Sequence, residues 1–397
     1  MLSFFRKPIF SDFRFIFGVF AVLALLVSIR TVFVTQSNNY LIFYHTLDHL
    51  IEGTDLYAKY PAEYEDRNHY APSFGALFSP IFLLPYSVGL FLWHFLFTGI
   101  WIYAVYRLPL THRQKVVMYW FCMQELFTAV ANSQTNPLIT AIPIFTFLAF
   151  EKRQPVWAAF FLLLGFNIKI YSLVGGALFL LYPQKGKFLL SMIGWGVAMA
   201  LFPLLFTTPD SLLWQYQNWL TELLNKSDGD KWLNLSIHRL IHQTISPDIS
   251  NSAIIGMGVV VFCSVLVYVQ RYKELWFRMM LLASILIFQV IFNPIAESPV
   301  FIVAVTGVMI WWFYSPKTWY DRAMLIGCFI FTVMSPSDLF PKVWRDEFVK
   351  PYVLKGLPCV LIWFRLIYLM HRYALGKAAV PTYNDDEQPL SASPQLG

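Results

Sequence analysis

Apolar runs recur along almost the whole chain, and this repetition constrains the fold more than any other feature of the sequence. Only 13% of the residues are charged, against about 25% in soluble domains. A chain of 397 residues that is 57% hydrophobic has too little interior to hide its apolar surface, so the sequence predicts a membrane protein. In lipid each segment must satisfy its own backbone groups, which predicts an all-α bundle. The runs lie at 15–35, 73–86, 87–107, 116–131, 137–150, 156–168, 170–183, 188–207, 252–270, 277–293, 299–314, 323–335 and 352–370.

Basic clusters separate the runs and predict the orientation of the chain. Cytoplasmic loops are enriched in Lys and Arg, so we expect both termini to be cytoplasmic in a multi-pass protein of the cell (inner) membrane. This arrangement leaves segments 36–71 and 208–251 as the large outer loops. We expect about twelve spans, within a range of about eleven to thirteen. The clusters are Arg113/Lys115, Lys152/Arg153, Lys185/Lys187, Arg271/Lys273/Arg278, Lys317/Arg322 and His371/Arg372.

Domain organisation follows from the same pattern. Residues 1–370 form one predicted transmembrane domain, and the polar segment 378–397 is predicted to be a disordered cytoplasmic tail. Run 73–86 contains Pro80 and Pro85 and is either a span or a re-entrant segment. The short runs 156–168 and 170–183 form a predicted hairpin broken near Lys169, which only a cavity would tolerate. The basic residues do not gather in one tail or face, so the net charge of +6 does not predict nucleic-acid binding.

The first outer loop begins with a predicted amphipathic helix. Tyr40, Phe43, Tyr44, Leu47, Leu50 and Ile51 recur at helical spacing and form an apolar stripe, which predicts a helix lying in the membrane interface. The opposite face carries His45, Asp48, His49 and Glu52. This face is either a solvated surface or a catalytic or metal-binding one, because His45 and His49 are one turn apart. Without a further ligand we do not predict a metal site, so no cofactor is expected.

The second half of this loop is rich in charge and tyrosine. Glu63, Glu65, Asp66, Arg67 and His69 stand just before a run, among several tyrosines. Aromatic rings stack on sugar faces and carboxylates accept hydrogen bonds from hydroxyl groups, so the pattern favours sugar binding. An interfacial aromatic belt would produce a similar composition.

The second outer loop, 208–251, combines aromatic and cationic residues. Trp214, Tyr216 and Trp219 predict another interfacial helix. Asn234, His238, Arg239 and His242 follow near the membrane, where a cationic group could bind a phosphate. Ordinary loop polarity is the alternative for each of these residues.

Four ionisable side chains interrupt or border apolar runs. Ionisable groups within spans are costly and generally face a cavity or a partner. Arg30 and Glu125 are either paired structural charges or catalytic groups. Lys169 is a candidate for binding a lipid phosphate, and Glu297, in the segment Pro294–Pro299, is a candidate functional carboxylate.

Several short motifs, in order across residues 15–370, make the chain resemble glycosyltransferase family 87. They are Gly53 with Asp55-Leu56-Tyr57, Tyr70 and Pro72 leading to Pro80 and Leu84-Pro85, Gln134-Thr135-Asn136, Lys169 after a short run containing Gly165, Asn234-Leu235-Ser236 with His238, and Asn293-Pro294-Ile295. Each motif is weak alone, and their order and spacing carry the resemblance.

The resemblance implies a GT-C fold and transfer of a single hexose-type sugar from a polyprenyl-phosphate carrier to an acceptor hydroxyl of a glycolipid or polysaccharide. It implies reaction at the outer face of the membrane, with inversion. A carboxylate would deprotonate the acceptor, and basic groups would hold the phosphate. The expected catalytic residues are Asp48, Asp66 and Glu297, the phosphate-binding residues are Lys169, His238 and Arg239, and the sugar- or acceptor-binding residues are Asn39, Asp55, Tyr57, His69, Tyr70, Gln134, Asn136 and Asn234.

One departure from the family pattern bears on the activity. Family members carry an aspartate about fourteen residues before the glycine that matches Gly53, and the residue at that position here is Asn39. Asparagine cannot act as a base, so Asp48, Asp66 or Glu297 would have to replace it. The alternatives are a non-catalytic member of the family, or a transporter or flippase of a lipid-linked or small polar substrate. A transporter would favour two related halves, which this sequence lacks.

Overall fold

The computed structural model describes residues 7–226, 234–337 and 340–381, and within these ranges it is helical, with no strand. This confirms the predicted all-α class. The α-helices are α1 (Phe13–Arg30), α2 (Asn38–Glu52), α3 (Pro72–Leu77), α4 (Ser79–Phe82), α5 (Tyr86–Arg107), α6 (His112–Ala131), α7 (Asn136–Glu151), α8 (Pro155–Ile168), α9 (Lys185–Leu201), α10 (Pro209–Lys226), α11 (Ile237–Thr244), α12 (Asn251–Cys263), α13 (Leu275–Ile291), α14 (Phe301–Tyr314), α15 (Trp319–Gly327), α16 (Lys342–Trp344) and α17 (Leu357–Ala374). Segment 382–397, most of the predicted disordered tail, lies outside the described residues.

Shorter helical segments of other pitch extend or connect these helices. The 3₁₀ segments are Pro8–Ser11, η4 (Ile170–Leu181), Phe202–Leu205, Ser264–Val267, Val269–Arg271 and Ser298–Val300, and the π-helical turns are Thr31–Thr35, Cys328–Met334 and Arg345–Val349. Among them η4 matters most for the site, because it follows α8 directly after one extended residue, Lys169.

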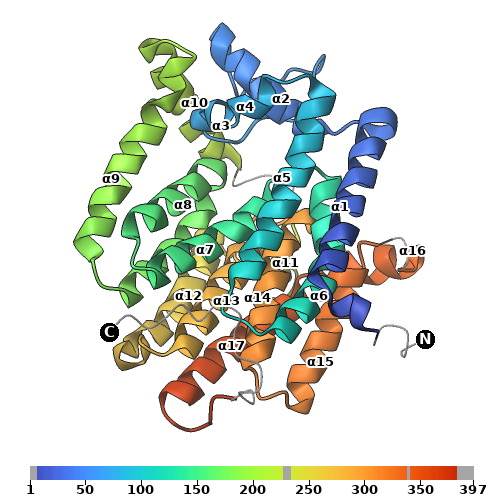
Figure 1. Ribbon diagram of the computed structural model, residues 1–397, viewed down its shortest axis with the longest axis vertical. Coiled ribbons are helices and arrows are strands. Elements are labelled where there is room, and N and C mark those ends of the chain that lie inside the picture. Colours follow the sequence, from blue (N-terminus) through green and yellow to red (C-terminus); the bar gives the residue numbers. More distant parts are fainter. Residues whose placement is uncertain (1–6, 227–233, 338–339, 382–397) are drawn as a thin grey trace.

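The centre of the bundle is the pair α13 and α14. Nearly every side chain of both helices is buried, as expected for a helix that is apolar on all sides. Helices α6, α7 and α17 pack around this pair, with η4 against α13. Figure 1 shows α2, α3, α4 and α10 gathered at the upper end of the bundle, and α12, α15 and α17 toward the lower end.

Three helical segments within the described residues are long and apolar enough to cross a membrane. They are Phe13–Thr35, Tyr86–Arg107 and Lys185–Leu205, and six further apolar helices are 10–17 residues long. These helices indicate a membrane protein. The expected number of about twelve spans is not reached by this criterion and stays a prediction.

Run 73–86 does not form a continuous helix. It breaks into α3 and α4, which have 6 and 4 residues and follow one another around Phe78. At about 1.5 Å per residue neither piece approaches the thickness of a hydrocarbon core. The proline residues within this run account for the break. Of the two possibilities for this run, a span or a re-entrant segment, the structure therefore argues against a single helical span.

The packing of α2 differs from the expected interfacial helix. Its apolar stripe is covered by protein, with Tyr40, Phe43, Leu47 and Leu50 buried, and only Ile51 is half exposed. The covering elements are α3 and α4, and Phe43 also contacts the ring of Trp93 in α5. A hydrophobic stripe alone does not specify whether lipid or protein will cover it. Protein therefore covers the stripe that we expected to face the membrane interface, and the interfacial position of the helix stays a prediction.

A buried ion pair joins α6 to the turn before α17. Lys355 Nζ donates to Glu125 Oε1 at 2.8 Å, and both side chains are at most 4% exposed. Of the two alternatives for Glu125, this favours the paired structural charge. The cost of removing both charges from water is offset only while both partners are present.

We expect Lys355→Met to lower the free energy of unfolding by about 3–5 kcal/mol, because it leaves the Glu125 carboxylate buried and unpaired. The combination Glu125→Leu with Lys355→Met should recover most of that loss, since a well-packed apolar pair carries no desolvation cost. Denaturant unfolding in detergent measures both. The control is Lys350→Met, whose partner Asp346 is solvent-accessible. Equal effects of Lys355→Met and Lys350→Met would contradict the argument.

Candidate functional site

A cavity of about 210 Å³ lies toward the end of the bundle that carries α2 and α10. Segments far apart in the sequence meet around it: α2, the loop between α2 and α3, the start of α7, the junction of α8 and η4, α10, and the turn after α13. The lining residues are Asn39, Ile42, Phe43, Asp66, Arg67, His69, Tyr70, Gln134, Asn136, Ile168, Lys169, Ile170, Tyr171, Trp219, Leu223, Asn293, Ile295, Glu297, Pro299 and Val300.

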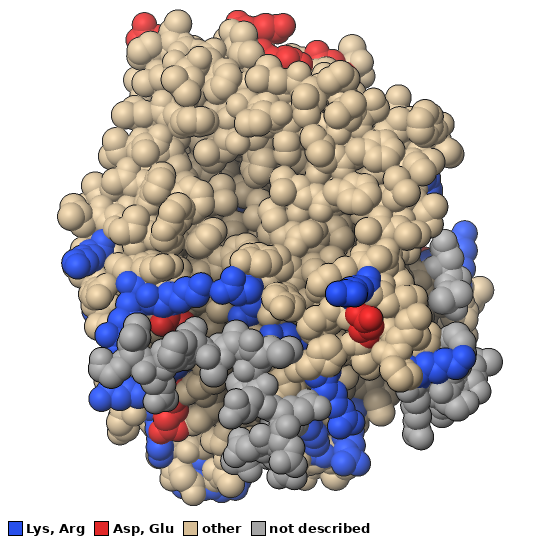
Figure 2. Space-filling view, in the orientation of Figure 1, with Lys and Arg blue, Asp and Glu red and all other residues tan. Residues whose placement is uncertain are grey.

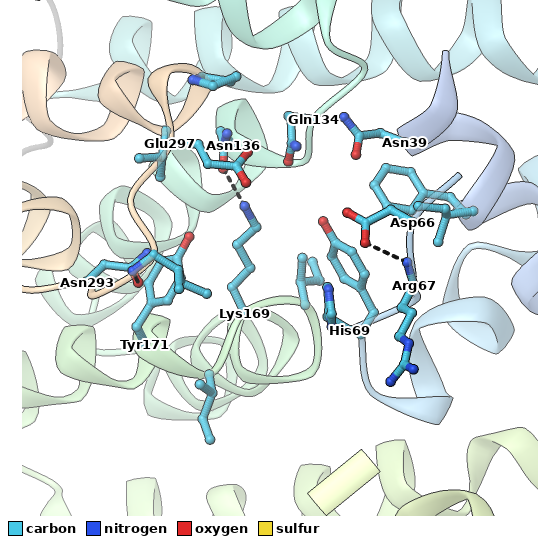
Figure 3. Close-up of a pocket in the computed structure, with 18 of the residues that line it drawn as sticks. Asn39, Asp66, Arg67, His69, Gln134, Asn136, Lys169, Tyr171, Asn293 and Glu297 are labelled. Atoms are coloured by element: carbon cyan, nitrogen blue, oxygen red, sulfur yellow. Dashed lines mark hydrogen bonds between the residues drawn. The ribbon is translucent and has the colours of Figure 1, made fainter. Parts of the chain in front are cut away.

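Lys169 enters this cavity from the break between α8 and η4. Its extended backbone ends α8, and its Nζ donates to Asn136 Oδ1 at 2.7 Å (Figure 3). Gly165 lets the two segments approach closely, because a Cβ there would lie 2.9 Å from Ser172 Cβ. The predicted hairpin broken at Lys169 is present, and it exposes the amine to the cavity.

Asn136 is the first residue of α7 and is almost completely buried. Pro137 follows at a position of the first turn where a missing N–H costs no hydrogen bond. The Asn136 amide therefore stands at the start of a helix, on the same wall as Lys169 and Glu297 (Figure 3).

The turn after α13 supplies Asn293 and Glu297. Asn293 Oδ1 accepts from Ile295 N at 3.1 Å, which closes the turn locally. Two contacts hold the turn from outside. Leu235 N, in the segment before α11, donates to Ala296 O at 2.8 Å, and His238 Nε2, in α11, lies 3.2 Å from Phe292 O. Glu297 itself is exposed to the cavity.

The loop between α2 and α3 forms the facing wall. Asp66 Oδ1 accepts from Arg67 N at 2.8 Å, and Figure 3 shows Asp66 beside Asn39, across the cavity from Glu297. Glu222 of α10 lies between the two basic side chains of this wall: its carboxylate is 3.5 Å from Arg67 Nη1 and 3.0 Å from His69 Nδ1. The wall thus carries a carboxylate, a guanidinium and an imidazole.

Buried hydrogen bonds hold this loop between α2 and α10. Gln215 of α10, which is fully buried, accepts from Leu56 N at 3.1 Å and donates to Thr54 O at 2.6 Å. On the α2 side, His49 Nε2 lies 2.9 Å from Glu63 Oε2. The loop therefore behaves as a fixed wall of the site.

Tyr70 contributes a neutral hydroxyl to the cavity. Burial raises the pKa of its phenol well above the ordinary value, and the nearby Glu297 carboxylate raises this pKa further. Tyr70 can therefore donate or accept a hydrogen bond without ionising. Its backbone is fixed by Tyr57, whose hydroxyl donates to Tyr70 O at 3.0 Å.

The structure brings together eight of the residues predicted from the sequence: Asn39, Asp66, His69, Tyr70, Gln134, Asn136, Lys169 and Glu297. It leaves six outside the cavity lining: Asp48, Asp55, Tyr57, Asn234, His238 and Arg239. Asp48 belongs to the exposed part of α2, where it pairs with His45 at 3.3 Å. The other five do not line the cavity. For four of them, hydrogen bonds to neighbouring segments account for this placement.

Four of these six residues position the walls of the cavity. Asp55 Oδ1 accepts from Tyr57 N and from Asn218 Nδ2, and Tyr57 supports Tyr70. Asn234 Oδ1 accepts from Ser236 N, and His238 Nδ1 is 2.9 Å from Asn251 Oδ1. Burial lowers the pKa of His238, which favours a neutral ring. The expectation that His238 is a phosphate-binding cation does not fit this placement.

Sequence reasoning did not assign site roles to Arg67, Tyr171, Trp219 or Asn293. Arg67 adjoins the predicted residue Asp66 in a charged segment, and Asn293 begins the Asn-Pro-Ile motif, so both had a usable signal in the sequence. Trp219 looked like part of an interfacial stripe, yet its Nε1 donates to His69 O at 3.3 Å and its ring borders the cavity. Only the packing of α10 on the loop shows that Trp219 borders the cavity rather than the membrane interface.

The cavity combines two cationic groups, two carboxylates and several amides with apolar side chains. This set suits a substrate that has an anionic group, hydroxyl groups and an apolar portion. Within the described residues no group of three or more His, Cys, Asp or Glu side chains could hold a metal ion. The chemistry that the site can perform with its own side chains is proton transfer and stabilisation of an anion.

Comparison with known proteins gives one finding about the family. The model of glycosyltransferase family 87 matches residues 68–294, more than half of the chain. No curated protein and no solved structure matches. The matched region contains Lys169, Asn136 and Asn293, and it ends just before Glu297.

Gln215→Leu tests the attachment of the loop to α10. The substitution removes both hydrogen bonds to the loop backbone, each contributing about 1 kcal/mol, so the loop should open locally about 30-fold more often. Amide hydrogen exchange at Leu56 measures the opening. Gln217→Leu, on the same helix, is the control, because Gln217 has no side-chain hydrogen bond to this loop among the described contacts. Unchanged exchange at Leu56 would contradict the assignment.

Acidification should weaken the fold through His238. Because burial lowers its folded pKa below the ordinary 6.5, the unfolded chain takes up the proton first as pH falls through 6.5. The contribution of His238 to the free energy of unfolding is therefore fully present above pH 6.5, and it decreases as the pH falls from 6.5 to the pKa of the folded state. We expect His238→Gln to show a smaller loss of unfolding midpoint than the unmodified protein between about pH 7 and about pH 5. Identical pH dependences would refute the role given to this ring.

Proposed function

The chain belongs to glycosyltransferase family 87, and from this membership we propose that it transfers a single hexose-type sugar from a polyprenyl-phosphate carrier to an acceptor hydroxyl, with inversion. The acceptor is a glycolipid or a polysaccharide. One observation carries the proposal: Lys169, Asp66 and Glu297, which are far apart in sequence, border a single cavity that also has apolar walls. A lipid-linked sugar phosphate has an anion, hydroxyl groups and an apolar chain, and thus fits these walls.

The Lys169 amine is the cationic group that we propose for stabilising the phosphate leaving group. In the proposed step the bond between the anomeric carbon and the phosphate oxygen breaks, and the electron pair stays on that oxygen. Lys169 Nζ stabilises the negative charge that develops there. Arg67 stands on the facing wall and pairs with Glu222. The Asn136 amide, 2.7 Å from Lys169 Nζ, orients the amine without neutralising it.

Asp66 is the carboxylate we propose as the base. It takes the proton of the acceptor hydroxyl while the acceptor oxygen bonds to the anomeric carbon. Its wall faces the one that holds Lys169, which suits attack from the side opposite the leaving group (Figure 3). It also stands beside Asn39, where the family carries an aspartate. Asp48 is 53% exposed and does not border the cavity, which argues against it.

Glu297 is better suited to bind the sugar than to act as base. It stands on the Lys169 wall, beside Asn136, so a carboxylate there would accept hydrogen bonds from sugar hydroxyl groups (Figure 3). Tyr70 and Trp219 supply aromatic surface, and Gln134 supplies an amide. Ile170 and Val300 provide an apolar border for the first part of the carrier chain.

The distribution of charge supports the proposed orientation in the membrane. On the face shown in Figure 2, the charged residues at the upper end, near α2 and α10, are Asp and Glu, whereas Lys and Arg lie in the lower half together with a few Asp and Glu. Under the positive-inside rule the lower end is cytoplasmic and the site faces outward. We therefore propose a GT-C-like domain over residues 1–370 with about twelve spans and cytoplasmic termini.

Transfer of labelled sugar from a polyprenyl-phosphate donor by the purified protein tests the function. Lys169→Gln should lower kcat by about 10²–10³-fold, and Asp66→Asn by about 10²–10⁴-fold. Glu297→Gln should mainly raise KM, because it removes binding of the sugar. Asp48→Asn is the matched control and should be unaffected.

Two results would overturn parts of this assignment. If Asp66→Asn retains full activity while Glu297→Gln loses it, the base is Glu297. If the unmodified protein transfers no sugar from any hexose donor, the presence of Asn39 in place of the family aspartate identifies a non-catalytic member.

A further inference from the structure

A second cavity, of about 470 Å³, lies between α5, α7 and α8, at the other end of these helices from the candidate site. Helix α7 begins at Asn136 in the candidate site and reaches the second cavity at Phe145. Nine residues of helix correspond to about 14 Å, and no residue lines both cavities, so the two are separate. The proposed transferase reaction does not use the second one.

The second cavity has an apolar interior and a polar rim. Ile100 of α5, Phe145 and Leu148 of α7 and Phe161 of α8 form its wall. Arg107, Lys152, Gln154, Tyr103 and Trp157 form the rim, near the end of α5 and the connection from α7 to α8. Such a groove suits a molecule with an apolar chain and a polar, negatively charged end.

The two cations of the rim have no carboxylate partner among the described residues. Arg107 Nη1 donates to the Tyr103 hydroxyl at 2.7 Å, a neutral partner, and Lys152 is exposed. Other cations near this end are paired: Arg278 with Glu151 at 2.6 Å, and Arg271 with Glu274 at 2.8 Å. The rim thus keeps its positive charge available for an anion.

The surroundings of the groove indicate that its ligand comes from the membrane. Tyr103 and Trp157 are each 51% exposed, and Leu96 of α5 and Val156 of α8 are also exposed. Exposed apolar side chains next to Trp and Tyr are typical of a surface at the level of lipid headgroups. A soluble anion would not fill the apolar wall.

We propose that this groove binds one anionic phospholipid, with the phosphate at Arg107 and Lys152 and an acyl chain along Ile100, Phe145 and Phe161. The phosphate oxygens accept charge-assisted hydrogen bonds from both cations. Trp157 and Tyr103 border the headgroup, and the chain covers apolar surface that would otherwise stay open. The lower, basic end of the bundle in Figure 2 is the side on which anionic lipid is attracted.

Native mass spectrometry of the delipidated protein tests the site. The protein is incubated with equal amounts of phosphatidylglycerol and phosphatidylcholine, and the ratio of the two retained lipids is measured. We expect a preference for phosphatidylglycerol that falls roughly tenfold in Arg107→Gln/Lys152→Gln. The matched control is Lys185→Gln/Lys187→Gln, which removes the same charge from exposed residues outside the groove and should keep the preference.

A second variant distinguishes binding in the apolar groove from attraction of the lipid by the positive surface charge alone. Ile100→Trp fills the apolar wall and leaves both cations in place, so retention of phosphatidylglycerol should fall as well. Unfolding midpoints without lipid establish that each variant is folded. Equal retention of the two lipids, an equal loss in both double variants, or undiminished retention in Ile100→Trp would each overturn the proposal.

Discussion

The break in the chain at Lys169 is the constraint around which the candidate site is organised. Non-helical backbone and an amine within apolar sequence are tolerated only beside a cavity, where polar partners are available. Gly165 lets η4 approach α8, and the Asn136 amide accepts from the amine at 2.7 Å. The loop before α3 and the turn after α13 then complete the walls, so the geometry of the cavity follows from the need to accommodate this break.

The cavity walls are fixed mainly by residues that do not border the cavity. Gln215 and Glu222 of α10 hold the loop that carries Asp66, and Leu235 and His238 hold the turn that carries Glu297. The side chains of Gln215, Glu222 and His238 are buried and paired, and Leu235 contributes its backbone N–H, which gives the facing walls definite positions. A proton-transfer group and an anion-binding group need such definite positions to act on the same substrate.

The two ends of α7 and α8 have different chemistry. At one end, Asn136 and Lys169 border the candidate site together with carboxylates from both walls. At the other end, Arg107 and Lys152 surround an apolar groove that has no carboxylate in its lining. Of these two cavities, only the candidate site therefore has carboxylates in its lining, together with cations.

The sequence by itself determined the all-helical class, the family, the positions of most helices and the break at Lys169. These follow from hydrophobic content, helical periodicity, prolines and the order of short motifs, all of which are local signals. It could not determine that the stripe on α2 faces α3 and α4, or that His238 points to a backbone carbonyl while Asp66 borders a cavity. Those outcomes depend on contacts between residues that are distant in sequence, such as His238 with Phe292 and Leu56 with Gln215. The same polar or apolar residue satisfies the local pattern whether protein, lipid or substrate covers it, and only the tertiary packing decides which one does.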